Sequence, residues 1–134
     1  MDAPPVVAVI NSTEDIVDML RIALEHAGLT VVSALTREIR EGHTDLERFI
    51  QQHDPRVILY DVAPPYAPNW NLFQHIAHIP VMAGRQFIIT STNARQVERL
   101  AGPQQHVYEI IGTPYDLDQI VQATREALKV RPSR

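Results

Sequence analysis

Asp61 is the residue whose type and position most directly suggest chemistry in this sequence. It closes the apolar run Val57–Tyr60, and a carboxylate in such a place can bind a hard divalent cation or accept a phosphoryl group. Magnesium prefers carboxylate oxygens, yet the first apolar run, Val6–Ile10, ends in the neutral Asn11 and Ser12. The sequence therefore keeps one candidate aspartate and lacks the acids that would hold a metal beside it.

Short apolar runs rich in Val and Ile predict the strands that position these residues. Their apolarity is continuous rather than alternating, which is typical of parallel strands covered on both faces. The predicted strands are Val6–Ile10, Thr30–Ala34, Arg56–Tyr60, Gln86–Thr90 and His106–Ile111.

Amphipathic stretches between the runs predict five helices. In the first, Ser12 is the expected N-cap, Asp15 completes a capping box, and Gly28 ends the helix. Strands alternating with helices predict an α/β fold. We expect a flavodoxin-like, doubly wound, five-stranded parallel sheet of order 2-1-3-4-5, with helices on both faces. Ligands of such sheets bind at the carboxyl ends of the strands, in the loops that begin at Asn11, Asp61, Thr90 and Ile111.

Composition excludes several classes of protein. The 134 residues fit one domain, which we place at residues 1–130, with 131–134 as a tail or linker stub. A net charge of −4 offers no broad footprint for nucleic acid, and the absence of cysteine excludes disulfides and thiol chemistry. No apolar run approaches the length of a membrane span and no basic leader is present, so we expect a cytoplasmic protein without membrane contact.

Polar residues follow the predicted strands in a fixed order: Asn11-Ser12, Asp61 with Pro65, Thr90-Ser91, and Thr113-Pro114-Tyr115. In this order and spacing the chain resembles the receiver domain of two-component response regulators, over nearly its whole length. The resemblance implies that Asp61 is the phosphoacceptor-equivalent residue and that Pro65 is the proline that follows it. It also implies that Asn11, Ser12, Thr90, Thr113 and Pro114 occupy the other positions of the family's site.

The positions at which this sequence differs from the family are those that carry the family's chemistry. Asn11 and Ser12 stand where the family has an acidic pair, and Thr113 stands where it has a lysine. Losing the acids weakens magnesium binding, and losing the lysine removes a positive charge from the phosphoryl oxygens. We therefore expect a degenerate receiver, or pseudo-receiver, with no metal and no cofactor.

The leading interpretation is a receiver-like signalling domain that acts mainly through protein–protein interaction, without efficient phosphorylation, and that is not an enzyme. The alternative is a functional phosphorelay receiver that is phosphorylated on Asp61 and uses magnesium. A third interpretation is a small α/β enzyme with a site at the same edge. No glycine-rich phosphate loop, Ser-His-Asp order or carboxylate pair supports this third interpretation.

The resemblance also implies partners and a surface for them. Partners would be proteins such as a histidine kinase or an output protein, and a homodimer would use the same face, formed by the fourth helix, fifth strand and fifth helix. Ile110 corresponds to the family's switch position, and Tyr108 is expected on the same strand face. Arg95 and Arg99 complete the predicted output face.

The peptide bond between Thr113 and Pro114 is expected to be cis. Receiver domains resemble one another in a cis bond at this place, although only about 5–6% of X-Pro bonds in folded proteins are cis. The lysine that Thr113 replaces concerns chemistry rather than turn geometry, so the bond should be retained.

Overall fold

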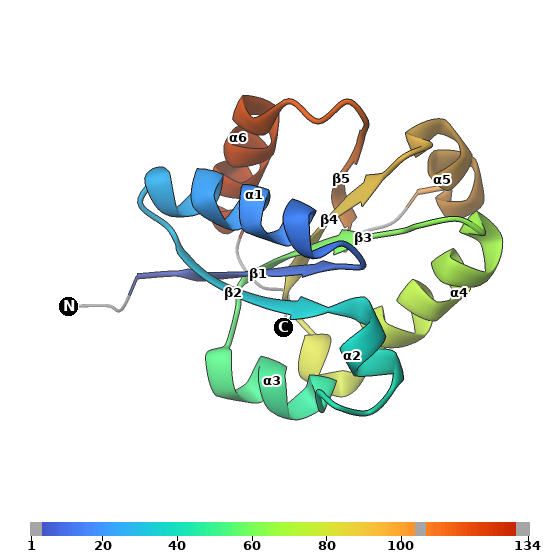
Figure 1. The fold of residues 1–134 in the computed structure, drawn as a ribbon, viewed down its shortest axis with the longest axis horizontal. Coiled ribbons are helices and arrows are strands. Elements are labelled where there is room, and N and C mark those ends of the chain that lie inside the picture. The colour runs from blue at the N-terminus through green and yellow to red at the C-terminus, as the bar shows by residue number, and fades with distance from the viewer. Residues whose placement is uncertain (1–3, 104–106, 131–134) are drawn as a thin grey trace.

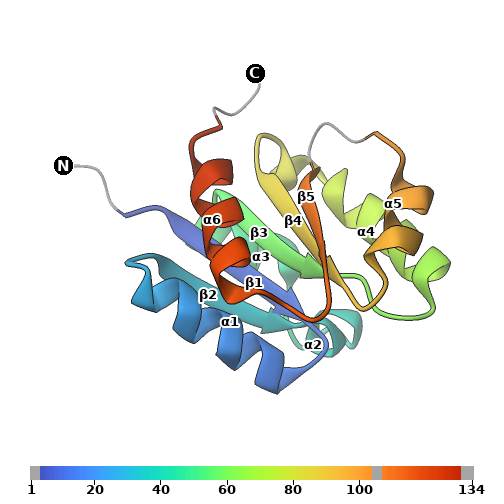
Figure 2. The ribbon, with the colours of Figure 1, turned by 90° about the horizontal axis from the view of Figure 1, so that it is seen from above.

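A parallel sheet forms the centre of the computed structural model, which describes residues 4–103 and 107–130. The order β2-β1-β3-β4-β5 can be followed across Figure 2, and all four neighbouring pairs are parallel. This is the predicted doubly wound order, so the expected fold class is confirmed. The strands are β1 (Val6–Asn11), β2 (Thr30–Leu35), β3 (Val57–Asp61), β4 (Gln86–Ser91) and β5 (Val107–Gly112).

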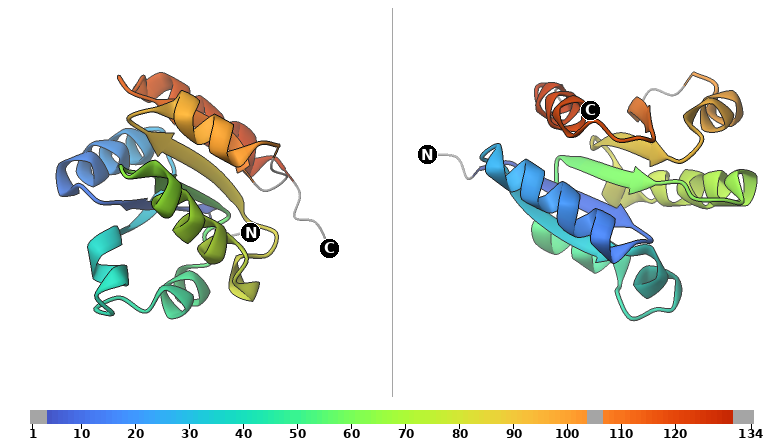
Figure 3. Two further views of the ribbon diagram at one scale, coloured as in Figure 1. Left: turned by 90° about the vertical axis from the view of Figure 1, so that its right-hand side faces the viewer. Right: turned by 45° about the horizontal axis from the view of Figure 1, so that its top comes forward.

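Helices cover both faces of the sheet. Figure 1 shows α1 and α6 above it, and the left view of Figure 3 shows the short α2 and α3 on the opposite side. The helices α4 and α5 pack on the same face as α3. The bounds are α1 (Glu14–His26), α2 (Thr36–Arg40), α3 (Leu46–His53), α4 (Tyr66–Ala77), the 3-10 turn η1 (Pro80–Met82), α5 (Ala94–Ala101) and α6 (Leu117–Leu128).

The sheet divides the core into two layers, because successive side chains of a strand point to opposite faces. In β1, Val7 and Val9 pack with α1 and α6, whereas Ala8 and Ile10 pack with α3, α4 and α5. Both faces of the strand are thus apolar, as the continuous apolar runs predicted. The second layer is centred on Phe73, whose ring centroid lies 5.0–5.1 Å from those of Tyr60, Trp70 and Phe87.

Two expectations about the helices were wrong. Five helices were predicted, but α2 is an additional one that forms directly after β2. Ser12 is not the N-cap of α1. Thr13 occupies that position without a side-chain cap bond, and its backbone N–H donates to Asn11 Oδ1 at 3.0 Å. The Asn11 side chain therefore closes the turn that precedes the helix, and no side chain of the described residues caps the helix itself.

Tyr108 was predicted to share a strand face with Ile110, and this prediction was wrong because β5 contains a bulge. Phe87 pairs with Val107, but the next residue of β4, Ile88, pairs with Glu109, so Tyr108 is the extra residue. As a result Tyr108 packs in the layer of α1 and α6, while Ile110 packs in the other layer. The two side chains therefore do not share a face. His106, predicted as the first residue of this strand, lies outside the described residues, as do residues 131–134.

No helix within residues 4–103 and 107–130 is long and apolar enough to cross a bilayer.

Candidate functional site

The carboxylate of Asp61 lies at the carboxyl edge of the sheet and is held by two hydroxyl groups. Thr90, its register partner on β4, donates to Asp61 Oδ1 at 2.8 Å, and Tyr115 donates to the same oxygen at 3.3 Å. The Thr90 side chain is buried, so its hydroxyl is fixed by the sheet itself. Asp61 and Thr90 were predicted to be neighbours, and the structure brings them together.

Burial dominates the electrostatics of Asp61. It raises the pKa of this carboxyl above the ordinary value, and the hydrogen bonds from Thr90 and Tyr115 counteract only part of that effect. Burial also raises the pKa of Tyr115 to about 12, and the charge of Asp61 adds to this shift. The phenol therefore stays protonated at neutral pH and acts as a donor to the carboxylate.

The two residues that replace the family's acidic pair have different surroundings. Asn11 is 3% exposed, and its side-chain oxygen already accepts from Thr13 N–H. Ser12 is exposed and lines a cavity of about 30 Å³ together with Asp61, Ala63 and Asn69. Only Ser12 of the replaced pair therefore lines the same small cavity as the aspartate.

This donor set is a poor one for magnesium. The ion requires near-octahedral coordination by several hard oxygens, among which carboxylates bring the compensating charge. Asp61 is the only acid that lines the small cavity, and Asn11 uses its oxygen within the turn. Within the described part of the chain, no cluster of three His, Cys, Asp or Glu side chains could hold a metal ion.

Thr113, at the position that the resemblance gives to the family's lysine, hydrogen-bonds the end of β4 and the residue that follows it. Its hydroxyl donates to the Thr92 carbonyl at 3.4 Å, and its backbone N–H donates to the Ser91 carbonyl at 3.2 Å. The bond to Pro114 is cis, as expected from the resemblance, and Pro64–Pro65 is a second cis bond. Thr113 and Pro114 therefore belong to the loop that carries Tyr115, whose hydroxyl reaches Asp61.

Sequence reasoning missed two residues of this edge. Tyr115 was placed after Pro114 as an aromatic residue, but its hydroxyl was given no role. Arg40 was missed because α2 was not predicted, and it lines the same small cavity as Asp61. A short polar segment such as Thr36–Arg40 gives no strong helical pattern. The one available signal was the distance between β2 and the next predicted helix, which left room for a further element.

The residues of the predicted output face lie on α5 and β5. Arg95 and Arg99 are exposed on α5, and Ile110 lies half-buried in the layer against that helix. Tyr108 faces α6 instead, where its hydroxyl donates to Glu126 Oε2 at 3.0 Å. A shallow hollow of about 210 Å³ lies between α5 and β5, and Glu98, Tyr108, Glu109 and Ile110 contribute to its lining.

Comparisons with known proteins agree with this geometry at the level of the fold. No family model and no curated protein sequence matches the chain. Among solved structures, a sensor protein from Polaromonas sp. JS666 aligns with a TM-score of 0.73 at 15% identity, covering 92% of this chain and 95% of that one.

Two further structures are similar. A signal receiver domain of a two-component histidine kinase from Clostridium thermocellum has a TM-score of 0.73 at 18% identity, covering 94% of this chain and 98% of its own. A response regulator from Thermotoga maritima has a TM-score of 0.72 at 16% identity, covering 96% and 100%. The chain therefore has the CheY-like, flavodoxin-type fold of response-regulator receiver domains.

Proposed function

We propose that this chain is a degenerate receiver domain, which acts in two-component-type signalling by binding other proteins and is not efficiently phosphorylated. The surroundings of Asp61 carry the proposal. Its carboxylate accepts hydrogen bonds from Thr90 and Tyr115, and it is the only acid lining its small cavity. The single lysine of the sequence, Lys129, caps the C-terminal end of α6 and so cannot replace the lysine missing at Thr113.

The proposed role is the binding of other proteins, which requires no catalytic turnover. The domain would be cytoplasmic, and its partner would be a histidine kinase, an output protein or a second copy of the chain. The partner surface would be the face formed by α5, β5 and α6, which presents Arg95, Glu98 and Arg99 at its exposed edge. A mixed-charge patch of this kind suits an interface of moderate size and polar character.

A phosphorylation assay tests the proposal directly. The protein is incubated with acetyl phosphate and magnesium chloride, and intact-mass spectrometry follows the addition of a phosphoryl group. We expect no measurable labelling under conditions that label an active receiver domain in parallel. Rapid labelling of the protein, abolished in Asp61→Asn, would overturn the proposal.

That outcome would favour the second candidate, a receiver in which Asp61 is still phosphorylated. Two observations favour this candidate. Thr90 hydrogen-bonds the carboxylate, and Arg40 places a cation in the lining of the same small cavity. Labelling that is also lost in Arg40→Gln, but not in Arg37→Gln on the same helix, would assign the missing positive charge to Arg40.

A further inference from the structure

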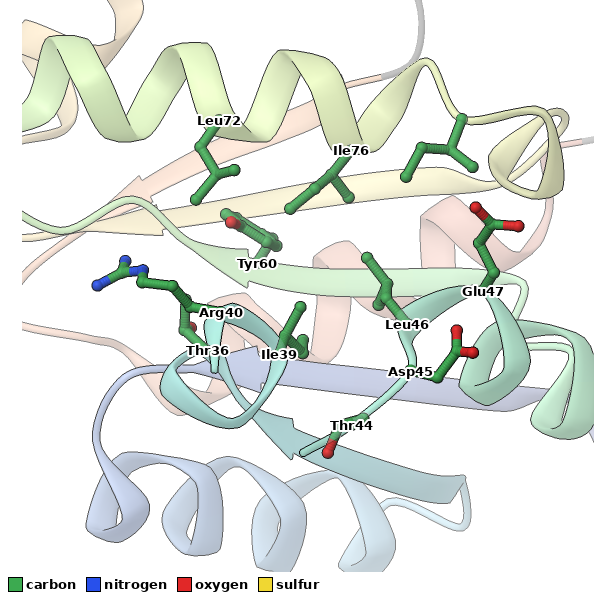
Figure 4. Close-up of a pocket in the computed structure, with 11 residues that line it drawn as sticks. Thr36, Ile39, Arg40, Thr44, Asp45, Leu46, Glu47, Tyr60, Leu72 and Ile76 are labelled. Carbon is green, nitrogen blue, oxygen red and sulfur yellow. The ribbon is translucent and has the colours of Figure 1, made fainter. Parts of the chain in front are cut away.

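A second, larger cavity lies next to the Asp61 edge, between α2, the start of α3 and α4. Its volume is about 430 Å³, within the range of small-molecule sites. Figure 4 shows side chains from these helices and from β3 converging on one space. The lining consists of Thr36, Ile39, Arg40, Thr44, Asp45, Leu46, Glu47, Tyr60, Leu72, Ile76 and Ile79.

The middle of this cavity is apolar. Ile39 and Leu46 approach from one side, and Leu72 and Ile76 approach from the other (Figure 4). Leu46 and Ile76 belong to the hydrophobic layer beneath the sheet and Ile39 and Leu72 pack against it, so the cavity is continuous with the core and opens to solvent at its half-buried edge. An aliphatic or aromatic ligand body would gain favourable burial against these side chains.

One end of the cavity is polar. The Thr36 hydroxyl is buried and has no hydrogen-bond partner among the described residues. Tyr60 also lines this end, and the residue as a whole is 2% exposed. A buried hydroxyl group without a partner is rare and costly, so Thr36 calls for a group that completes it.

Arg40 supplies positive charge at the same end, as Figure 4 shows. It forms no ion pair with any carboxylate of the described residues. Burial raises the pKa of Tyr60 to about 12, so its hydroxyl remains a donor at neutral pH. A guanidinium, a phenol and a threonine hydroxyl together form a donor set for an anionic oxygen group.

The opposite end carries negative charge, from Asp45 and Glu47. Asp45 already caps α3, because its side chain accepts from the Arg48 N–H at 3.2 Å. A second anionic group on the ligand would be repelled at this end. A ligand with anionic groups at both ends is therefore disfavoured, and a single anionic head would lie at the Arg40 end, where Arg40 also faces the charge of Asp61 in the adjoining small cavity.

We propose that this cavity binds a small monocarboxylic acid with an aliphatic or aromatic body, its carboxylate at Arg40, Thr36 and Tyr60. The site shares Thr36, Arg40, Tyr60 and Leu72 with the small cavity beside Asp61, so the bound acid lies next to that edge of the sheet. This inference goes beyond the proposed signalling role and does not depend on whether Asp61 is phosphorylated.

Octanoate is the probe that tests the site, with octan-1-ol and octylamine as uncharged and oppositely charged matches. Titration is followed by calorimetry and by backbone amide shifts in a ¹⁵N-labelled protein. We expect octanoate to bind saturably, with a dissociation constant at or below about 1 mM. Shifts should concentrate at Ile39, Tyr60 and Leu72, and both analogues should bind at least about tenfold more weakly.

Arg40→Gln should weaken octanoate binding at least about tenfold while leaving octan-1-ol binding unchanged. Arg37→Gln is the matched control, because Arg37 is exposed on the same helix and does not line the cavity. Ile39→Phe, which adds volume at the half-buried edge of the cavity, should abolish binding of all three probes. Tyr60→Phe keeps the ring in the core and should reduce only octanoate affinity.

Three results would contradict the proposed site. The first is the absence of saturable octanoate binding, and the second is an affinity for octylamine equal to that for octanoate. The third is an equal affinity of Arg40→Gln and Arg37→Gln for octanoate. Because no assay here involves a phosphodonor, each result is separable from failure of the proposed signalling role.

Discussion

Asp61 lies in a partly buried environment that disfavours the charged form of its carboxyl group. Burial raises the pKa of the carboxyl, which means that the folded state binds the proton more tightly than the unfolded state does. The folded protein is then relatively favoured when Asp61 is protonated, and this advantage is lost as the pH rises through the folded-state pKa. At neutral pH the ionised carboxylate therefore reduces stability.

Asp61→Asn should accordingly raise the free energy of unfolding at pH 7, because it removes a buried charge. The asparagine oxygen can still accept from Thr90 and Tyr115. Urea unfolding from pH 7 down through the acid range measures the difference, which should shrink as the pH falls and the wild-type carboxyl takes up a proton. Asp118→Asn, in the exposed first turn of α6, should give no such gain. A destabilising Asp61→Asn at pH 7 would refute this assignment.

The Tyr115 hydroxyl should matter because its acceptor is charged. Tyr115→Phe removes a donor to Asp61 and should cost about 1 kcal/mol at pH 7. In an Asp61→Asn background the acceptor is neutral, so the same substitution should cost less. Urea unfolding of the four proteins gives the coupling between the two residues. An equal cost in both backgrounds would mean that the hydroxyl stabilises the loop independently of the carboxylate.

At the level of elements, one arginine joins two loops at the other edge of the sheet. Arg85, just before β4, donates to the carbonyls of Val81 and Pro55 at 2.9 and 2.8 Å. It also pairs with Asp54 at 2.7 Å, and its own side chain is only 15% exposed. The arginine therefore fixes the turn before β3 against the turn before β4.

Arg85→Met should destabilise the protein by about 2 kcal/mol, because it keeps the aliphatic stem and leaves two carbonyls without their donor. Most of this loss comes from the carbonyl bonds, since an ion pair with the 81% exposed Asp54 contributes little. Thermal and urea unfolding measure the change. Arg48→Met, on the exposed face of α3, is the control and should stay within about 0.5 kcal/mol of the wild type.

The sequence predicted every strand and the order of the sheet, because continuous apolar runs carry a strong signal. It also predicted that Asp61 and Thr90 lie together, since neighbouring parallel strands end at one edge. It failed where a side chain's direction depends on contacts that are not local. The β5 bulge moves Tyr108 to the other strand face, which only the register with β4 determines. The role of Arg40 depended on α2, whose five residues give too short a pattern to recognise.

At the level of the whole molecule, the proposed surface for a partner or a second copy is the face of α5, β5 and α6. Arg95, Glu98 and Arg99 are exposed on α5, so in the proposed two-fold dimer an arginine of one copy would pair with Glu98 of the other. Arg95→Glu combined with Arg99→Glu should weaken self-association at least about tenfold, because like charges would then face each other. Sedimentation velocity over a range of concentrations measures this. Arg37→Glu on α2 is the matched control. A wild-type protein that stays monomeric at high concentration would contradict the proposed homodimer.

Restoring the charged residues of the receiver family at three positions tests whether this fold can still form a metal site. Asn11→Asp, Ser12→Asp and Thr113→Lys together return two carboxylates and a lysine to the edge beside Asp61. Since Asn11 and Ser12 both follow β1 directly, and an aspartate at position 11 can still accept from Thr13 N–H, the turn should be retained. Calorimetry should then detect magnesium binding in the millimolar range by the triple variant and none by the wild type. Asn11→Asp alone should not suffice, because it adds one carboxylate to a site that needs several oxygens. Equal magnesium binding by the wild type would mean that Asp61 with neutral oxygens already forms a metal site, and would restore the phosphorylated receiver as the better interpretation.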